Sequence, residues 1–344
     1  MSFLTALTEG VLLGGYYAMT ACGLSFMFGV MKIINLAHGS LAIVAAFGLW
    51  IIADRFEYDP FLALIVVLPA MACIGWLLQR GILERSARSG ELIPILSTFG
   101  LAIVIENVLF ECFGADIRSL APYVGSLAYD SFDLGGGSYI GELAVLTFVV
   151  AIVLLGGLQL FLSYTPLGRQ IRATAEDPDT VELVGVNSRF VNSVAASIAL
   201  VTVGLAGLFL ALRTNFDPYS GSLQLIFGFE AGVIGGTGSL WGTLAGGIIL
   251  GLAQTLGAHI HPQGFLLAGH GVFLLVLVGR IYISGPALHG FLKSKFGGGA
   301  LLPTPASRSN AGLIFRSASR SSSLCCSCCS PPVRLSCPKT FWTG

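Results

Sequence analysis

Long apolar runs separated by short polar segments make up most of this chain. A bilayer core about 30 Å thick needs roughly 20 residues of α-helix. Eight apolar runs come close to that length: 10–31, 36–53, 60–79, 92–113, 143–163, 191–212, 240–258 and 264–279. A ninth and shorter run, 223–236, fits either a short span or a re-entrant segment. The pattern predicts an all-α, polytopic membrane protein with eight or nine transmembrane helices.

The composition supports this interpretation. Of the 344 residues, 54% are hydrophobic and only 10% are charged, and the mean hydropathy is +0.83. Soluble domains carry about 25% charged residues, so the composition excludes a soluble enzyme and a disordered chain. The first basic residue, Lys32, follows the first apolar run. A cleavable signal peptide has positive charge before its apolar stretch, and we therefore expect a retained first helix.

The two ends of the chain differ in charge. Residues 1–280 contain 11 basic residues and all 18 acidic ones, a net charge of −7, whereas residues 281–344 contain seven basic residues and no acidic one. Five of the eight cysteines also lie after residue 320, without the spaced pairs of a zinc module. We expect a transmembrane permease domain over 1–284 and a disordered, basic, Ser/Cys-rich tail over 285–344, with an aberrant or replaced end favoured over a metal site.

Basic residues indicate the orientation, because cytoplasmic loops are enriched in Lys and Arg. Ten of them fall on one side: Lys32, Arg80, Arg85, Arg88, Arg169, Arg172, Arg189, Arg280, Lys293 and Lys295. The opposite side receives only Arg55, Arg118 and Arg213. The rule predicts an outside N-terminus, nine spans with 223–236 crossing, and a cytoplasmic loop over 164–190.

That loop contains signals for two short helices. A first helix over 166–176 would be capped by Thr165. A second, of about seven residues, would begin at Pro178 with Asp177 as its cap and stop at Gly185. Such a pair suits docking to another protein, while capping alone also fits an ordinary connecting loop.

Polar residues inside apolar helices are the default candidates for a functional site. We expect the Glu106 carboxyl to be hydrogen-bonded within the bundle or protonated, because desolvation disfavours its charge. Asn35 and His38 are three residues apart and would share a helix face, where they either stabilise the start of the second span or line a translocation path. Glu230 either faces that path at a broken helix or marks a helix end.

Glycines indicate close helix packing in the last part of the domain. Three pairs have the small-xxx-small spacing that lets helices approach closely: Gly232 and Gly236, Gly242 and Gly246, and Gly247 and Gly251. We expect Gly235, Gly236, Gly238 and Gly242 to take part in this packing.

Three stretches, taken in order, resemble the permease subunits of branched-chain amino acid ABC transporters. They are Asn35-Leu36-Ala37-His38-Gly39; Leu167-Gly168-Arg169-Gln170-Ile171-Arg172-Ala173 with Glu176-Asp177-Pro178 and Gly185-Val186-Asn187; and Gly228-Phe229-Glu230-Ala231 with Gly235-Gly236-Thr237-Gly238-Ser239-Leu240-Trp241-Gly242-Thr243. The resemblance covers residues 1 to about 280. The chain departs from the family pattern at Val181 and Glu182, and again after Arg280.

The resemblance implies an ABC importer permease fold in the bacterial cytoplasmic membrane, with branched-chain or related amino acids as cargo. It implies ABC ATPase subunits, a second permease subunit and a periplasmic or extracellular substrate-binding protein as partners, within membrane lipid and without nucleic acid. The residues that it assigns to the ATPase-coupling loop are Gly168, Arg169, Arg172, Ala173, Glu176, Asp177, Pro178 and Gly185.

The chain itself is not expected to be an enzyme or to hold a cofactor. None of its four lysines follows a glycine, so it has no Walker A motif, and ATP would be bound by the partner subunit. The alternatives are the same machine importing urea, short amides or a sugar, an ion-coupled secondary transporter with Glu106 as the ion site, and a membrane-embedded enzyme, for which no catalytic set is recognisable.

Overall fold

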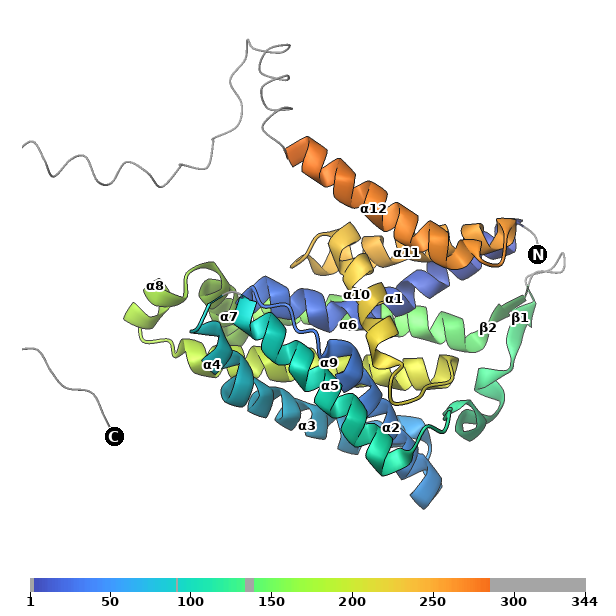
Figure 1. Ribbon diagram of the computed structural model, residues 1–344, viewed down its shortest axis with the longest axis horizontal. Coiled ribbons are helices and arrows are strands. Elements are labelled where there is room, and N and C mark those ends of the chain that lie inside the picture. Colours follow the sequence, from blue (N-terminus) through green and yellow to red (C-terminus); the bar gives the residue numbers. More distant parts are fainter. Residues whose placement is uncertain (1–2, 91, 134–138, 285–344) are drawn as a thin grey trace, which may run out of the picture. The chain divides into compact units, whose positions relative to one another are not determined.

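The computed structural model describes residues 3–90, 92–133 and 139–284, and nearly all of its elements are helices (Figure 1). The α-helices are α1 Phe3–Met31, α2 His38–Phe56, α3 Pro60–Leu78, α4 Glu84–Ala87, α5 Leu92–Phe113, α6 Glu142–Tyr164, α7 Pro166–Glu176, α8 Pro178–Leu183, α9 Ser188–Arg213, α10 Gly221–Gly235, α11 Leu240–Ile260 and α12 Gly264–Ser284. A π-helical turn, η1 Gln79–Leu83, links α3 to α4, and η2 Ala121–Ala128 is a 3₁₀ helix. Two three-residue strands, β1 Ser131–Asp133 and β2 Tyr139–Gly141, pair antiparallel with Phe132 opposite Ile140.

The all-α, polytopic architecture is confirmed. Among the described residues, seven helices are long and apolar enough to cross a membrane: α1, α2, α3 with its extension to Ala87, α5, α6, α9 and α11. The runs 223–236 and 264–279 form the apolar helices α10 and α12. With 15 residues, α10 is about 22 Å long, shorter than a bilayer core of about 30 Å. The predicted tail, 285–344, lies outside the described residues.

The third helix is longer than its apolar run. The run ends at residue 79, but the helix that begins at Pro60 continues through η1 to Ala87. The π-helical turn carries Arg80, whose guanidinium lies 5.0 Å from the centre of the Trp76 ring. Arginine and tryptophan are both typical of a helix that reaches the membrane interface. Arg80 thus lies inside the continuing helix, whereas Arg85 and Arg88 lie at its end.

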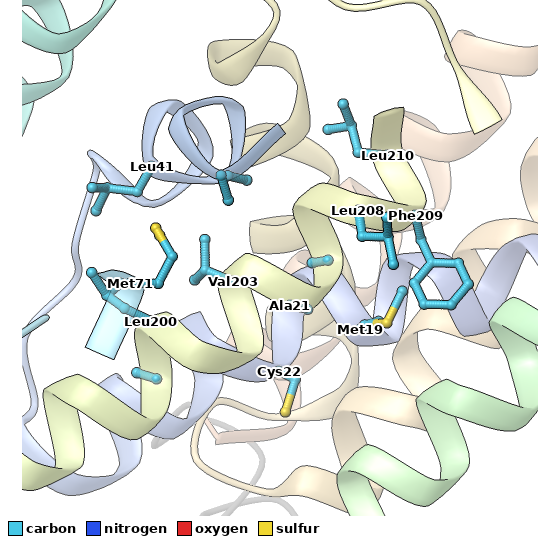
Figure 2. Packing of buried hydrophobic residues seen from close by; sticks show 14 of the residues in the cluster. Met19, Ala21, Cys22, Leu41, Met71, Leu200, Val203, Leu208, Phe209 and Leu210 are labelled. Atoms are coloured by element: carbon cyan, nitrogen blue, oxygen red, sulfur yellow. The ribbon is translucent and has the colours of Figure 1, made fainter. Parts of the chain in front are cut away.

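The core is built around α1 and α9, the two most deeply buried helices (Figure 2). Met19 and Cys22 of α1 and Leu200 and Phe209 of α9 are almost fully buried. Helix α1 packs against α11, α9, α10 and α6. A helix that is apolar all round is one that is enclosed by others, and α1 is such a helix.

Glycines permit the closest of these approaches, between α1 and α11. A Cβ atom on Gly247 would lie 2.8 Å from the Ala18 nitrogen, and one on Gly251 would lie 2.6 Å from the Gly14 nitrogen. Both distances are shorter than real side chains tolerate, so the two backbones touch directly. The spacing of Gly247 and Gly251 therefore places two glycines on the face of α11 that meets α1.

The two ends of the helical bundle carry different elements. The short helices α4, α7 and α8 gather at one end, and the β1–β2 hairpin lies at the opposite end (Figure 1). The first of these ends is the one predicted to be cytoplasmic from its arginines.

Candidate functional site

The connection between α6 and α9 forms the two short helices that the sequence predicted. The Thr165 side chain accepts a hydrogen bond from the Gly168 nitrogen at 2.9 Å, and α7 begins at Pro166 and ends at Glu176. Asp177 is extended, and its Oδ1 accepts hydrogen bonds from the nitrogens of Asp179 and Thr180 at 3.2 and 3.3 Å. The predicted caps and helix starts are therefore confirmed.

The two faces of α7 have different surroundings. Ile171 and Thr174 are buried, whereas Arg172, Ala173 and Glu176 are exposed. Gly168 is buried against the end of α6, where a Cβ atom would lie 2.6 Å from the Leu162 Cα. Gly168 thus allows α7 to fold back tightly on α6, while the exposed residues form a surface that another protein can contact.

The remaining coupling-loop residues lie around this surface. Arg169 is exposed and its Nη1 donates to the Tyr164 carbonyl at 3.4 Å. Pro178 is exposed at the start of α8. Gly185 follows α8 with a φ of +87°, a left-handed conformation that glycine adopts without a steric penalty.

Sequence reasoning missed an apolar tip on α8. Leu183, the last residue of α8, and Val184, which follows it, are 86% and 75% exposed. Val181 of the same helix is buried. Exposed apolar residues at the polar end of a membrane protein are candidates for contact with a partner. The sequence did contain a sign of this tip, because two apolar residues stand directly before Gly185. They come at the end of a helix that is too short to bury both of its faces.

The first motif joins α1 to α2. The structure corrects the expected helical pairing of Asn35 and His38, because α2 begins at His38 and Asn35 lies in the turn before it. The Asn35 Oδ1 accepts a hydrogen bond from the Ala37 nitrogen at 3.0 Å. The His38 Nε2 lies 2.9 Å from the Thr20 carbonyl oxygen. Both side chains are buried, and His38 ties the start of α2 to the middle of α1.

A carboxylate links three helices beside this joint. Gly39 of α2 and Gly221 of α10 lie in direct backbone contact, since a Cβ atom on Gly221 would lie 2.7 Å from the Ser40 nitrogen. The contact brings two hydroxyl groups to Glu106 of α5: the Ser40 Oγ donates to its Oε1 at 2.9 Å, and the Ser222 Oγ donates to the same atom at 3.0 Å.

The surroundings of Glu106 are polar but carry no positive charge. The residue is 9% exposed, and no Lys, Arg or His among the described residues forms a salt bridge with it. Its neighbour along the same helix, Glu111, is exposed. Glu106 is therefore hydrogen-bonded within the bundle, which was one of the two states expected from the sequence. The two hydroxyl groups offset part of the free-energy cost of removing its carboxylate from water.

A second buried carboxylate lies further along α10. Glu230 is 4% exposed and lies inside this helix, and its Oε1 is hydrogen-bonded to the His270 Nδ1 of α12. Phe227 stacks on the His270 ring with a centroid separation of 6.4 Å. The other carboxylate oxygen, Oε2, is buried without a hydrogen-bond partner. Glu230 therefore joins α10 to α12 in mid-helix, and its position matches neither a broken helix nor a helix end.

The third motif forms the turn from α10 to α11. Gly236 and Gly238 have φ values of +98° and +91°, so both shape the turn itself. Gly238 also packs on α1, since a Cβ atom on Gly29 would lie 3.0 Å from the Gly238 Cα. The Gly238 nitrogen donates to the Ser25 Oγ of α1 at 3.1 Å, and the Ser239 side chain caps α11. Ser25 was not predicted, because only the fold brings α1 to this turn.

The other glycines of this motif have packing roles. Gly235 and Gly242 lie in backbone contact across the turn, where a Cβ atom on Gly235 would lie 2.7 Å from the Thr243 nitrogen. Gly232, by contrast, has open space where its side chain would be. Gly246 continues the close packing along α11, since a Cβ atom there would lie 2.5 Å from the Gly235 nitrogen.

The described residues contain no recognisable catalytic centre. No group of three or more His, Cys, Asp or Glu residues in this part of the chain could hold a metal ion. What the arrangement provides is a set of buried polar junctions between helices, together with an exposed helix pair at one end.

Comparison with known proteins gives the chain its relatives. The family model described as "Branched-chain amino acid transport system / permease component" matches residues 6–279. The high-affinity branched-chain amino acid transport system permease protein BraD of Pseudomonas aeruginosa is 28% identical over 290 residues, which cover 81% of this chain and 94% of BraD. The corresponding LivH protein of Escherichia coli is 28% identical, covering 80% of this chain and 93% of LivH.

A more distant relative is named for another cargo. The fructose import permease protein FrcC of Rhizobium meliloti is 28% identical over 262 residues, covering 71% of this chain and 69% of FrcC. No solved structure matches the chain.

Proposed function

Because the chain belongs to the branched-chain amino acid transport permease family, whose members are non-catalytic membrane subunits of ABC importers, we propose that it imports branched-chain amino acids across a bacterial cytoplasmic membrane. In this proposal two permease subunits form the pathway, ATPase subunits bind α7 and α8, and a substrate-binding protein delivers the cargo from outside. The chain binds no ATP itself.

The choice of cargo is supported by how much of each relative the chain covers. It spans 94% of BraD and 93% of LivH, both named for branched-chain amino acids, but 69% of the permease named for fructose. Branched-chain amino acids are therefore the first candidate, and a sugar is the second.

The single observation that carries the ATPase contact is the capped helix pair at the end of the bundle. Arg172, Ala173 and Glu176 are exposed on α7, and Leu183 and Val184 form an apolar tip on α8. Apolar residues surrounded by charged ones are typical of the centre of a protein–protein contact. Since Thr165 and Asp177 fix where each helix begins, the pair can transmit a push from a partner to α6 and α9.

The transport path is proposed to run beside the Glu106 junction. This carboxylate joins α2, α5 and α10 through two serine hydroxyls, so movement of any of these helices changes its hydrogen bonds. Buried ionisable residues in membrane helices commonly mark solute paths. Asn35 and His38 line the joint next to this junction, and Glu230 lies further along α10.

Co-purification and uptake together test the proposal. The tagged chain should retain an ATPase with a Walker A motif. Membranes that contain both, together with the second permease subunit and the substrate-binding protein, should take up radiolabelled leucine when ATP is present. Unlabelled isoleucine and valine should compete with leucine, whereas fructose and urea should not. Competition by fructose alone would assign the sugar as cargo, and uptake driven by an ion gradient without ATP would overturn the proposal.

A further inference from the structure

An apolar groove runs along the outside of the bundle between α3, α6 and α9. Its volume is about 650 Å³, and its lining includes Trp76, Val153, Gly157, Phe161, Ser197 and Val201. Val153 is 67% exposed, so the groove opens on the outer surface of the bundle. The hydroxyl of Ser197 donates to the Ser193 carbonyl of its own helix. The wall therefore offers hydrocarbon and almost no free polar group.

The groove exists because α6 does not close on α9. Helix α6 packs mainly against α1 and α7, and it contacts α9 only sparsely, whereas α3 and α9 pack closely together. Gly157 widens the gap further, since nothing lies within 4 Å of the position of its Cβ atom. Within a bilayer no water is present to fill such a gap, so a hydrocarbon chain must occupy it.

The length of the groove matches one leaflet. On α6 its lining extends from Val150 to Phe161, a rise of about 16 Å along a helix. The hydrocarbon core of a bilayer is about 30 Å thick, so the groove covers about half of it. A single acyl chain of one leaflet has this reach, whereas a transmembrane helix of a partner would continue beyond it.

The end of the groove nearest α7 carries a positive charge. The Arg80 guanidinium lies 5.0 Å from the Trp76 ring centre, and its Nε donates to the Ser193 Oγ at 3.4 Å. No carboxylate among the described residues forms a salt bridge with Arg80, whereas the nearby Arg189 pairs with Glu84 at 3.3 Å. The terminal amino groups of Arg80 are thus available to a negatively charged group at the membrane surface.

We propose that this groove binds an anionic phospholipid of the leaflet on the α7 side. One acyl chain lies between α6 and α9, and Arg80 contacts the phosphate-containing headgroup. The bound lipid fills the space between the two helices that lead into and out of the α7–α8 pair, and it thereby stabilises their spacing. This inference does not depend on which solute the protein transports.

Quenching of Trp76 fluorescence by brominated lipids tests the proposal. The full chain is reconstituted with Trp50, Trp241 and Trp342 replaced by phenylalanine, in vesicles that contain brominated phosphatidylglycerol or brominated phosphatidylcholine. The lipid affinity measured from Trp76 quenching should be about fivefold higher for phosphatidylglycerol than for phosphatidylcholine. This is the ratio expected for one guanidinium at the membrane surface. Arg80→Gln should reduce the ratio to about one while leaving quenching itself in place.

A matched pair of glycine variants separates the groove from the general lipid surface. Gly157→Leu fills the groove, whereas Gly156→Leu adds the same side chain one position away, outside the lining, and neither Cβ atom meets a neighbour within 4 Å. Gly157→Leu should abolish the headgroup preference and Gly156→Leu should retain it. Equal quenching by both lipids in the parent protein would overturn the proposal. Protection of Trp76 from both lipids would also overturn it, because a protein segment would then cover the groove.

Discussion

The hydroxyl group of Ser40 lies 2.9 Å from the Oε1 of Glu106, across the contact between α2 and α5. Ser222 of α10 donates to the same oxygen atom. One buried carboxylate therefore holds three helices together, without a cation among the described residues to neutralise it. A junction of this kind is sensitive to small helix movements, because hydrogen bonds weaken steeply with distance and angle.

Replacing Glu106 tests the junction. Glu106→Ala should lower the free energy of unfolding by about 1–3 kcal/mol, because the buried Ser40 hydroxyl and the partly buried Ser222 hydroxyl lose their acceptor. Glu106→Gln retains an acceptor oxygen, so it should preserve folding and assembly but alter leucine uptake. Thermal unfolding of the purified chain and uptake by the assembled transporter measure these two effects.

Glu111→Gln is the control for this experiment, since Glu111 lies on the same helix but is exposed. It should change neither stability nor uptake. Unchanged uptake by Glu106→Gln at every substrate concentration would remove Glu106 from the transport path.

The capping role of Asp177 leads to a second prediction. Asp177→Ala removes the side chain that accepts hydrogen bonds from the first turn of α8, a loss of about 1 kcal/mol. Because α8 has only six residues and is not stable alone, ATP-driven uptake should fall strongly. Asp177→Asn keeps a capping oxygen and should retain most of the uptake. Equal uptake by the two variants would show that the cap is not needed for coupling.

The apolar tip of α8 gives a third prediction. If Leu183 becomes buried against the ATPase, Leu183→Ser should weaken ATPase binding by about tenfold or more. Glu182→Gln, on the same exposed helix, should leave binding nearly unchanged. The affinity of the purified ATPase for the chain in nanodiscs measures both. A larger effect of Glu182→Gln than of Leu183→Ser would place the centre of the contact elsewhere on this surface.

The contact between α1 and α11 gives a fourth prediction. Gly247→Ala would place a methyl group 2.8 Å from the Ala18 nitrogen, and it should destabilise the chain by about 1–3 kcal/mol through overpacking. Gly232→Ala has open space for its methyl group and should be tolerated. Thermal unfolding of the two variants in the same detergent makes the comparison. A Gly247→Ala variant as stable as the parent chain would contradict the direct backbone contact.

Features encoded by neighbouring residues could be predicted from the sequence. Apolar runs gave the helices, and Thr165, Asp177 and Gly185 gave the bounds of α7 and α8, because a cap acts on backbone groups within three residues. The spacing of Gly247 and Gly251 indicated a packing face, because residues four apart lie on the same side of a helix.

Features that join distant parts of the chain could not be predicted. Ser40 and Ser222 are 66 and 116 residues from Glu106, and His270 is 40 residues from Glu230. The sequence identifies each carboxylate as a buried polar group that needs a partner, but only the fold selects the partner. The start of α2 also escaped prediction, because the side chain of Asn35 forms a local turn that competes with the helix.

The most direct test of the central claim is leucine accumulation in sealed vesicles that contain the purified chain with its partner permease and the substrate-binding protein, with and without the ATPase. The account predicts that leucine rises above its external concentration only when the ATPase and ATP are both present, and that Asp177→Ala reduces this accumulation more than Asp177→Asn. Uphill accumulation by the chain alone, driven by a proton or sodium gradient, would contradict it.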